Sequence, residues 1–344
     1  MPFAPTVACW FRAMKELPAI VNALLAPDAT TAVLATLVAV QGSSYRRPGA
    51  RLLVRPNAPR TGSISGGCLE EDVIARAAQV LATGRPDAVV YDTTSENDVV
   101  WGVGLGCHGV VRVLLEKISP RPPWATALAK NFSARRPTDL AVTHNGSERE
   151  AWGTRLAAPG DCADPDALFL DHVKPPTALL IFGAGDDAQP LVRLAKELGW
   201  RVTIADPRSA FATADRFPQA DSLVVGTAAS LVSRIDPDPE TVAVVMTHHY
   251  VHDVPVLQGL LSRPLAYVGL LGPRKRAEKI LGDLAGAGMS ISAEQRARLH
   301  APVGLDLGAD SPEQVALSIV AEIQAALTRR DAQPLRDRTR PIHD

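Results

Sequence analysis

Residues 177–207 read TALLIFGAGDDAQPLVRLAKELGWRVTIADP and carry the clearest structural signal in the chain. An apolar run that favours a buried strand leads into the pattern G-x-G-x-x-A at residues 183–188, and a helical pattern follows. Asp206 ends the next expected strand, about twenty residues after Gly185. Such glycines let the backbone approach a pyrophosphate, and the acid accepts a hydrogen bond from a ribose hydroxyl. Gly183, Gly185 and Asp206 are therefore candidate residues for binding NAD(P).

Two acidic residues inside this turn leave two interpretations open. Asp186 and Asp187 stand where the pyrophosphate would lie, at the positive end of the expected helix. In one interpretation they cap the helix and repel an anion, so that the scaffold binds no nucleotide. In the other interpretation the turn still admits a dinucleotide.

The regular alternation of strand and helix patterns after this point predicts an α/β fold with a Rossmann-like, doubly wound parallel sheet. Residues 1–172 instead mix short β-rich runs with glycine-rich loops, which predicts a mixed α/β domain. The connector DHVKPPT contains two prolines that exclude a helix between the two regions. We therefore expect a second domain at residues 173–330 and a flexible polar tail at 331–344.

Two polar segments follow later strands of the expected parallel sheet, at the edge where such sheets bind ligands. The first is THHYVHD at residues 247–253, where His248 and His249 are candidates for a proton donor, a metal ligand or a substrate clamp. A polar loop without a ligand is the alternative. The second is GPRKR at residues 272–276, which opens a helix with cations that oppose the helix dipole. Arg274 is therefore a candidate phosphate ligand, and a solvated basic face is the alternative.

A glycine-rich turn in the first region, GSISGGC at residues 62–68, leads directly into an expected helix. Cys68 then lies at a helix N-terminus, where free backbone amides favour a thiolate. Gly66 and Gly67 allow a sharp turn that leaves the sulfur accessible, and Ser65 precedes them. A nucleophile, a persulfide carrier and a ligand of a soft metal all fit this position. The alternative is a small buried hydrophobic residue.

Two further segments of the first region contain candidate ligand-binding residues. GLGCHG at residues 104–109 places Gly106, Cys107 and His108 in a second glycine-rich cysteine loop, which is either a tight turn or a site of close ligand approach. SSYRRPGAR at residues 43–51 supplies hydroxyl groups and cations that could hold a phosphate by charge-assisted hydrogen bonds. The candidate cations are Arg46, Arg47 and Arg51.

Composition excludes several classes of function. The chain has 344 residues and a formal net charge of −1, so we expect no binding of nucleic acid driven by overall charge. Its apolar runs are shorter than the roughly 20 residues that a membrane-spanning helix needs, and the N-terminus lacks the features of a signal peptide. Its 4 cysteines are far apart and form no CxxC pair, which favours a reducing cytoplasm over a disulfide framework.

The motifs together resemble the XdhC/CoxI family, the accessory factors of xanthine and carbon-monoxide dehydrogenases. The resemblance is carried by QGSSYRRPGARLLVRPNAPRTGSISGGCLEEDV at residues 41–73, by GLGCHGVVRVLLE, and by HAPVGLDLGADSPEQVALSIVAEI at residues 300–323. It covers nearly the whole chain except residues 121–176 and the tail. Two positions depart from the family pattern: His108 replaces a glycine of GCGG, and Asp186-Asp187 replaces the usual His-Val of GAGHVA.

The resemblance implies a chaperone for the molybdenum cofactor, molybdopterin. Such a protein protects the cofactor, presents it for sulfuration by a cysteine desulfurase and hands it to an apo-molybdenum hydroxylase of the xanthine or carbon-monoxide dehydrogenase type. The family's GGC cysteine corresponds to Cys68, which would hold the molybdenum. The phosphate would then be bound by Arg46, Arg47 and Arg51, or by Arg274 and Arg276 from the other domain.

Three functions remain for the chain at this point. The first is the cofactor chaperone, an accessory protein rather than a turnover enzyme, for which a homodimer is the expected assembly. The second is an NAD(P)-dependent oxidoreductase that uses the Rossmann-like domain, with His248 or His249 as the acid–base group. The third is a sulfurtransferase-like protein in which Cys68 carries a persulfide.

Overall fold

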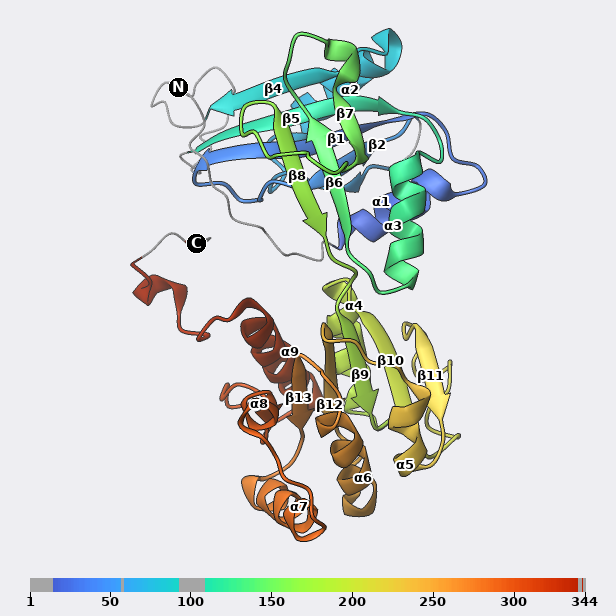
Figure 1. Cartoon of the computed structure of the whole chain (residues 1–344), viewed down its shortest axis with the longest axis vertical. Coiled ribbons are helices and arrows are strands. Elements are labelled where there is room, and N and C mark those ends of the chain that lie inside the picture. The colour runs from blue at the N-terminus through green and yellow to red at the C-terminus, as the bar shows by residue number, and fades with distance from the viewer. Residues whose placement is uncertain (1–14, 57–58, 93–108, 340–341, 343–344) are drawn as a thin grey trace. The chain divides into compact units, whose positions relative to one another are not determined.

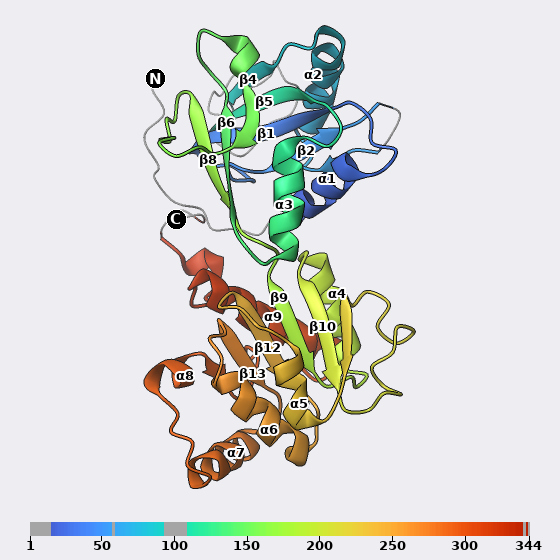
Figure 2. The same cartoon turned by 45° about the vertical axis from the view of Figure 1, so that its right-hand side comes forward.

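The computed structural model describes residues 15–56, 59–92, 109–339 and 342, and these divide into two compact units (Figures 1 and 2). The N-terminal unit comprises Met1–Pro175 and the C-terminal unit comprises Pro176–Asp344. Each unit has its own hydrophobic cores. None of the helices in the described part of the chain is long and apolar enough to cross a membrane.

The C-terminal unit is built on a six-stranded sheet with the order β11-β10-β9-β12-β13-β14, in which every pairing is parallel. Counted within the unit this order is 3-2-1-4-5-6, the arrangement of the dinucleotide-binding fold. The predicted doubly wound parallel sheet is therefore confirmed. Its strands are β9 (Ala178–Phe182), β10 (Arg201–Asp206), β11 (Ser222–Val225), β12 (Thr241–Val245), β13 (Tyr267–Leu270) and β14 (Leu299–His300).

Helices cover both faces of this sheet because its central strands carry apolar side chains on both sides (Figure 1). In β9, Leu179 and Ile181 pack with α4 and α9, whereas Leu180 and Phe182 pack with α5, α6 and α7. The helices are α4 (Ala188–Glu197), α5 (Ala228–Leu231), α6 (Tyr250–Leu261), α7 (Arg274–Gly286), α8 (Ala293–Ala297) and α9 (Pro312–Thr328), with short 3₁₀ helices η3 (Val232–Arg234) and η4 (Leu335–Asp337).

The N-terminal unit contains a five-stranded antiparallel sheet with the order β3-β2-β1-β5-β4. Helix α2 packs on one face of this sheet and ends at Gly84, whose φ of +72° closes the helix in the left-handed conformation. Helices α1 and α3 lie side by side on the other face (Figure 2). These elements are α1 (Glu16–Leu25), β1 (Ala32–Gly42), β2 (Arg51–Val54), β3 (Thr61–Gly62), α2 (Glu70–Thr83), β4 (Asp87–Asp92), β5 (Gly109–Ile118) and α3 (Pro123–Ser133).

A second, three-stranded antiparallel sheet occupies the segment that the family resemblance left without a match. Its order is β7-β6-β8, and Val142 of β6 packs against Val38 of β1 and Leu114 of β5. This contact explains why β1 is buried on both faces along most of its length. The elements are β6 (Thr138–Thr143), a short 3₁₀ helix η2 (Arg149–Ala151), β7 (Gly153–Leu156) and β8 (Leu168–Val173).

Candidate functional site

The turn that carries Cys68 lies between β3 and α2 in the N-terminal unit. Gly66, Gly67 and Cys68 are all exposed, and Cys68 is a free thiol. Gly67 has a φ of +117°, a backbone conformation that favours glycine, and open space surrounds the position where its side chain would be. The alternative of a buried structural cysteine is therefore wrong for Cys68. Its sulfur stands on an open double-glycine turn just before a helix.

A buried carboxylate holds this turn in place from beneath. Glu70 is 1% exposed, and its Oε1 accepts hydrogen bonds from the amides of Ile64 (3.2 Å) and Ser65 (3.0 Å). Its Oε2 accepts the hydroxyl of Ser65. The Ser65 Oγ in turn accepts the amides of Gly67 (3.0 Å) and Leu69 (3.2 Å), one on each side of Cys68. The backbone around the cysteine is thus fixed through the Ser65 hydroxyl.

Two of the acidic residues after Cys68, Glu70 and Asp72, are bonded to other groups of the unit. Burial opposes ionisation of Glu70, but the hydrogen bonds from Ser65 and Ile64 outweigh it, so the pKa of Glu70 lies below its ordinary value. The Asp72 carboxylate accepts hydrogen bonds from Arg76 Nε (2.7 Å) and from the Tyr91 hydroxyl (2.6 Å). Sequence reasoning missed Glu70 as an anchor, because an acid in the first turn of a helix is ordinary.

Two of the arginines predicted to bind phosphate are engaged within the unit. Arg51 is buried, pairs with Asp171 at 2.7 Å and donates to the carbonyl of Gly49, so its guanidinium faces the core. The prediction that Arg51 is available for a phosphate is therefore wrong. Arg46 remains half-exposed and pairs with Glu16 of α1. Arg47, beside it, is also half-buried.

The loop between β1 and β2 contributes an aromatic side chain to this turn. A methyl group built on Gly66 would stand 3.7 Å from two carbons of the Tyr45 ring, so the ring packs over that glycine. Tyr45 is 66% exposed. The predicted residues Gly106, Cys107 and His108 lie outside the described residues. Of the N-terminal candidates, the structure therefore assembles Ser65, Gly66, Gly67 and Cys68 into one turn.

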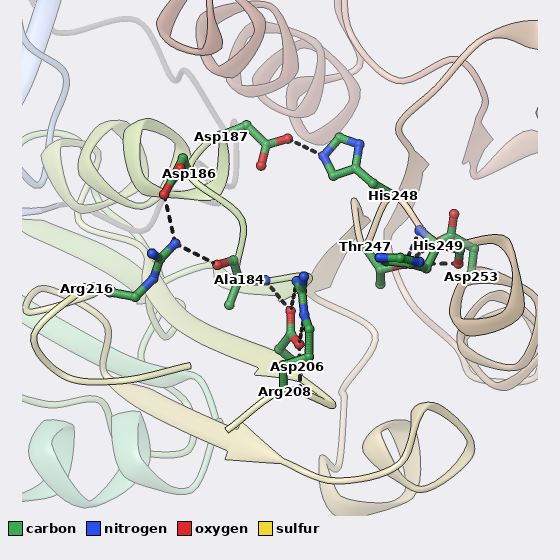
Figure 3. Close-up of polar contacts among 10 residues, drawn as sticks. All are labelled: Ala184, Asp186, Asp187, Asp206, Arg208, Arg216, Thr247, His248, His249 and Asp253. Carbon is green, nitrogen blue, oxygen red and sulfur yellow. Dashed lines mark hydrogen bonds and ion pairs between the residues drawn. The ribbon is translucent and has the colours of Figure 1, made fainter. Parts of the chain in front are cut away.

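The second group of candidates lies at the carboxyl ends of the parallel strands in the C-terminal unit (Figure 3). Gly183 has a φ of +124°, and a side chain there would overlap the carbonyl oxygen of Met246 at the end of β12. A side chain on Gly185 would stand 2.6 Å from Asp187 Oδ1. Gly183 therefore allows the chain after β9 to pack closely against the end of β12. The space beside Gly185 is filled by the carboxylate of Asp187.

Both acids of this turn are paired with bases from distant segments. Asp187 Oδ2 lies 2.6 Å from His248 Nε2, and Figure 3 shows His248 reaching across from the loop after β12. Asp186 accepts a hydrogen bond from Arg216 Nη2 at 2.9 Å, and the same nitrogen donates to the carbonyl of Ala184 at 3.1 Å. Neither acid caps α4 with its side chain. The structure thus assigns them to cross-links between loops.

Asp206, the expected ribose acceptor, is fully buried and already bonded by the protein. Its Oδ2 accepts the Ala184 amide (2.7 Å) and Arg208 Nη2 (2.8 Å), and its Oδ1 accepts the Arg208 amide (2.8 Å) and Nε (2.9 Å). Burial opposes ionisation, but the hydrogen bonds from Arg208 and Ala184 outweigh it and hold the pKa of Asp206 below its ordinary value. A ribose diol would have to displace Arg208.

The loop after β12 is fixed by a further buried acid. Asp253 is 1% exposed and accepts hydrogen bonds from the Thr247 hydroxyl (2.6 Å) and from Arg276 of α7. Arg276 also reaches the carbonyl of His248 at 3.4 Å, so it faces inward, whereas Arg274 at the start of α7 is exposed. Within the described residues, no group of three or more His, Cys, Asp or Glu side chains could hold a metal ion.

Comparison with known proteins covers both units. The sequence model of the XdhC and CoxI family matches residues 26–92, and that of the XdhC Rossmann domain matches residues 179–323. The chain is 34% identical, over 90% of its length and 97% of the other, to a probable subunit of xanthine dehydrogenase from Bacillus subtilis (strain 168). This chain belongs to the XdhC and CoxI family.

Two other proteins extend the comparison of this XdhC and CoxI family member. It is 27% identical to the molybdenum cofactor insertion chaperone PaoD of Escherichia coli (strain K12), over 85% of this chain and 82% of PaoD. The crystal structure of a xanthine dehydrogenase from Bacillus halodurans superposes with a TM-score of 0.79 at 28% identity, covering 93% of this chain and 98% of that chain. The Cys68 turn falls within the first matched range, and Gly183, Gly185, Asp206 and Arg274 fall within the second.

Proposed function

We propose that this member of the XdhC and CoxI family is a chaperone that binds the molybdenum cofactor at the Cys68 turn and inserts it into an apo-molybdenum hydroxylase. The observation that carries the proposal is the exposed, free thiol of Cys68 on an open double-glycine turn. A protein named as a molybdenum cofactor insertion chaperone aligns with most of the chain and supports the same role.

The chemistry of the turn suits the metal end of this cargo. A thiolate is a soft ligand, which suits molybdenum better than a carboxylate does. Cys68 stands two residues before the first residue of α2, and its sulfur is exposed there. The open space beside Gly67 admits a bulky group close to the backbone, and a side chain at that position would fill it. Cys68, Gly66 and Gly67 are thus the residues that would hold the cargo.

The remaining parts of the proposal concern the phosphate, the partners and the compartment. Arg46 and Arg47 directly follow Tyr45, whose ring lies over Gly66, and Arg274 is an exposed cation at the start of α7 in the C-terminal unit. We propose Arg46 and Arg47 as ligands of the cofactor phosphate, with Arg46 exchanging its pairing with Glu16 for the phosphate, and Arg274 as an anion-binding residue of its own unit. The client enzyme in this proposal is a hydroxylase of the xanthine or carbon-monoxide dehydrogenase type, and a cysteine desulfurase supplies the sulfur. The protein acts in the cytoplasm as a homodimer.

An NAD(P)-dependent oxidoreductase is the weaker alternative, because two features of the Rossmann turn oppose a dinucleotide. The carboxylate of Asp187 fills the space over Gly185 that a pyrophosphate would need. Both oxygens of Asp206 already accept hydrogen bonds from Arg208 and Ala184. Gly183, Gly185 and Asp206 therefore support the fold of the unit better than they support cofactor binding.

The test is the cofactor content of the full chain purified from a host that makes the molybdenum cofactor. Bound pterin is measured after oxidation to its fluorescent form, and molybdenum is measured by elemental analysis. We expect near-stoichiometric pterin in the wild type and a large loss in Cys68→Ala. Cys162→Ala is the matched control, because Cys162 is the other exposed free cysteine of the described chain, and it should retain wild-type pterin.

Two results would contradict the proposal in different ways. A wild-type protein that carries no pterin would remove the chaperone function itself. Wild-type pterin content in Cys68→Ala would retain the chaperone function but move the site away from Cys68. Persulfide on Cys68 of a pterin-free protein, detected by intact mass before and after reduction, would favour the sulfurtransferase-like alternative.

A further inference from the structure

Tyr45 occupies an unusual position beside the cysteine turn. It belongs to the loop between β1 and β2, yet its ring lies against Gly66, two residues before Cys68. The plane of the ring faces the glycine, because the Cγ, Cδ1 and Cε1 atoms stand at nearly the same distance, 3.7–3.8 Å, from the position of a Gly66 side chain. The rest of the side chain is open to solvent, since Tyr45 is 66% exposed.

Exposure of one aromatic ring would carry no argument by itself, because isolated apolar side chains are common on protein surfaces. The immediate surroundings of Tyr45 distinguish it. The ring lies against Gly66, which is followed by the exposed residues Gly67 and Cys68, and the Ser65–Glu70 hydrogen bonds hold the backbone of this turn. An aromatic ring supported on a fixed backbone offers a flat apolar face at little cost in conformational entropy.

We propose that Tyr45 is a ligand-binding residue whose ring stacks on the planar heterocycle of the cargo that Cys68 holds by its metal. This inference rests on the proposed function and adds a second contact to the same site. The molybdenum cofactor combines a dithiolene-bound metal with a flat pterin, so a soft thiolate and an aromatic face serve its two ends. A methyl group at Gly66 would be in ordinary van der Waals contact with the ring at 3.7 Å, so only a side chain larger than alanine would displace the ring from the turn.

The chemistry of stacking predicts which replacements of Tyr45 are tolerated. A stack needs the ring and not the hydroxyl, so Tyr45→Phe should bind pterin as the wild type does and Tyr45→Trp should bind it at least as well. Tyr45→Leu keeps an apolar side chain over Gly66 but removes the π face, and Tyr45→Ala removes both. Replacing a stacking aromatic by alanine typically weakens binding of a planar base roughly 5- to 100-fold.

The experiment measures how fast each full-length variant, loaded in the same cofactor-producing host, releases pterin during dialysis. We expect release to be roughly 5- to 100-fold faster from Tyr45→Ala and Tyr45→Leu, and within about twofold of wild type from Tyr45→Phe. Leu335→Ala is the control, because Leu335 is 61% exposed but belongs to the 3₁₀ helix η4 of the C-terminal unit. Thermal melting of each variant verifies that the turn is folded, and Tyr45→Leu separates loss of packing from loss of the aromatic face.

The outcomes separate this inference from the function on which it rests. If wild-type protein carries no pterin, the proposed function fails and the inference fails with it. If wild-type protein carries pterin and Tyr45→Ala releases it at the wild-type rate, only the role of Tyr45 is overturned. If Tyr45→Phe releases pterin as fast as Tyr45→Ala, the hydroxyl rather than the ring makes the contact, and stacking is overturned.

Discussion

The carboxylate of Asp187 lies over Gly185, with its Oδ1 2.6 Å from the point where a β-carbon on that glycine would stand. In a dinucleotide-binding turn the same space belongs to the pyrophosphate. His248 keeps the carboxylate there through the 2.6 Å contact between Nε2 and Asp187 Oδ2. The unit thus has the strand order of a dinucleotide-binding fold with an acid of its own chain in the phosphate position.

This relationship predicts that the wild-type protein binds dinucleotides poorly. A fluorescence titration with NADH or NADPH should show no saturation below about 1 mM, which corresponds to a binding free energy weaker than about 4 kcal/mol. Asp187→Ser removes the charge over Gly185 and should bind more tightly than wild type. Saturable micromolar binding by the wild type would contradict the interpretation, and Asp72→Ser, an acid of the other unit, serves as the control.

The hydrogen bonds that Glu70 accepts beneath the Cys68 turn should contribute to the free energy of unfolding. Glu70→Ala would leave the amides of Ile64 and Ser65 without their acceptor, so we expect a loss of about 1–3 kcal/mol in the free energy of unfolding. Glu70→Gln keeps one acceptor oxygen and should lose less. Urea unfolding of the full chain measures both variants. Glu71 is the exposed neighbour, and Glu71→Ala should change the free energy by no more than about 0.5 kcal/mol. Equal losses at positions 70 and 71 would contradict the anchoring role.

Two glycines of the C-terminal unit should respond to alanine with opposite signs. Gly183→Ala places a side chain against the Met246 carbonyl at a φ of +124°, so we expect a loss of more than about 2 kcal/mol in the free energy of unfolding. Gly282 is exposed within α7, and nothing lies within 4 Å of its missing side chain. Gly282→Ala should therefore raise stability by about 0.5–1 kcal/mol. Thermal melting compares the two variants, and the same sign for both would refute the assignment of Gly183 to strand packing.

His144 predicts a pH dependence of stability. It is 1% exposed, and neither ring nitrogen has a hydrogen-bond partner among the described residues. Burial, together with the charge of Arg112, lowers the pKa of His144 from 6.5 to about 4. In the unfolded chain this histidine binds a proton as the pH falls below about 6.5, whereas in the folded chain it binds one only near pH 4. The free energy of unfolding therefore decreases as the pH falls from 6.5 to 4.

The expected loss from this single histidine is up to about 3 kcal/mol between pH 7 and pH 4. His144→Leu removes the titrating ring, so its free energy of unfolding should change less over this range than that of the wild type. Urea unfolding at pH 7, 5.5 and 4.5 measures the difference. His249→Gln, at an exposed histidine of the C-terminal unit, is the matched control for loss of an imidazole ring. Identical slopes for His144→Leu and wild type would rule out this role of His144.

The features that the sequence predicted are those whose signals are close together along the chain. The glycine turn, the strand before it and Asp206 lie within about thirty residues and follow one recurring geometry, so the Rossmann-like sheet could be predicted. The cap of α9 is equally local, because Ser311 and Gln314, three residues apart, form a capping box. The accessible Cys68 belongs to the same class, because it depends on two adjacent glycines and the helix that follows.

The features that the sequence did not predict depend on distant residues. Nothing in the sequence near Asp187 indicates that its carboxylate pairs with His248, which is 61 residues away. Arg51 closely follows Arg46 and Arg47 in a segment whose sequence is typical of a loop. It is nevertheless buried, because it pairs with Asp171 of the three-stranded sheet. The three strands β6, β7 and β8 are short, and their pairing with one another and their packing against β1 and β5 are decided by tertiary contacts rather than by local pattern.

The pairing of acids with bases at the carboxyl edge of the parallel sheet has an electrostatic consequence for ligand capture. Asp186, Asp206 and Asp253 each contact an arginine, and Asp187 contacts His248. Opposite charges held close together produce a field that decays faster with distance than the field of a single charge. The three aspartate–arginine pairs therefore add little to the long-range field of this edge, and the exposed Arg274 at the start of α7 supplies positive charge by which the edge attracts anions.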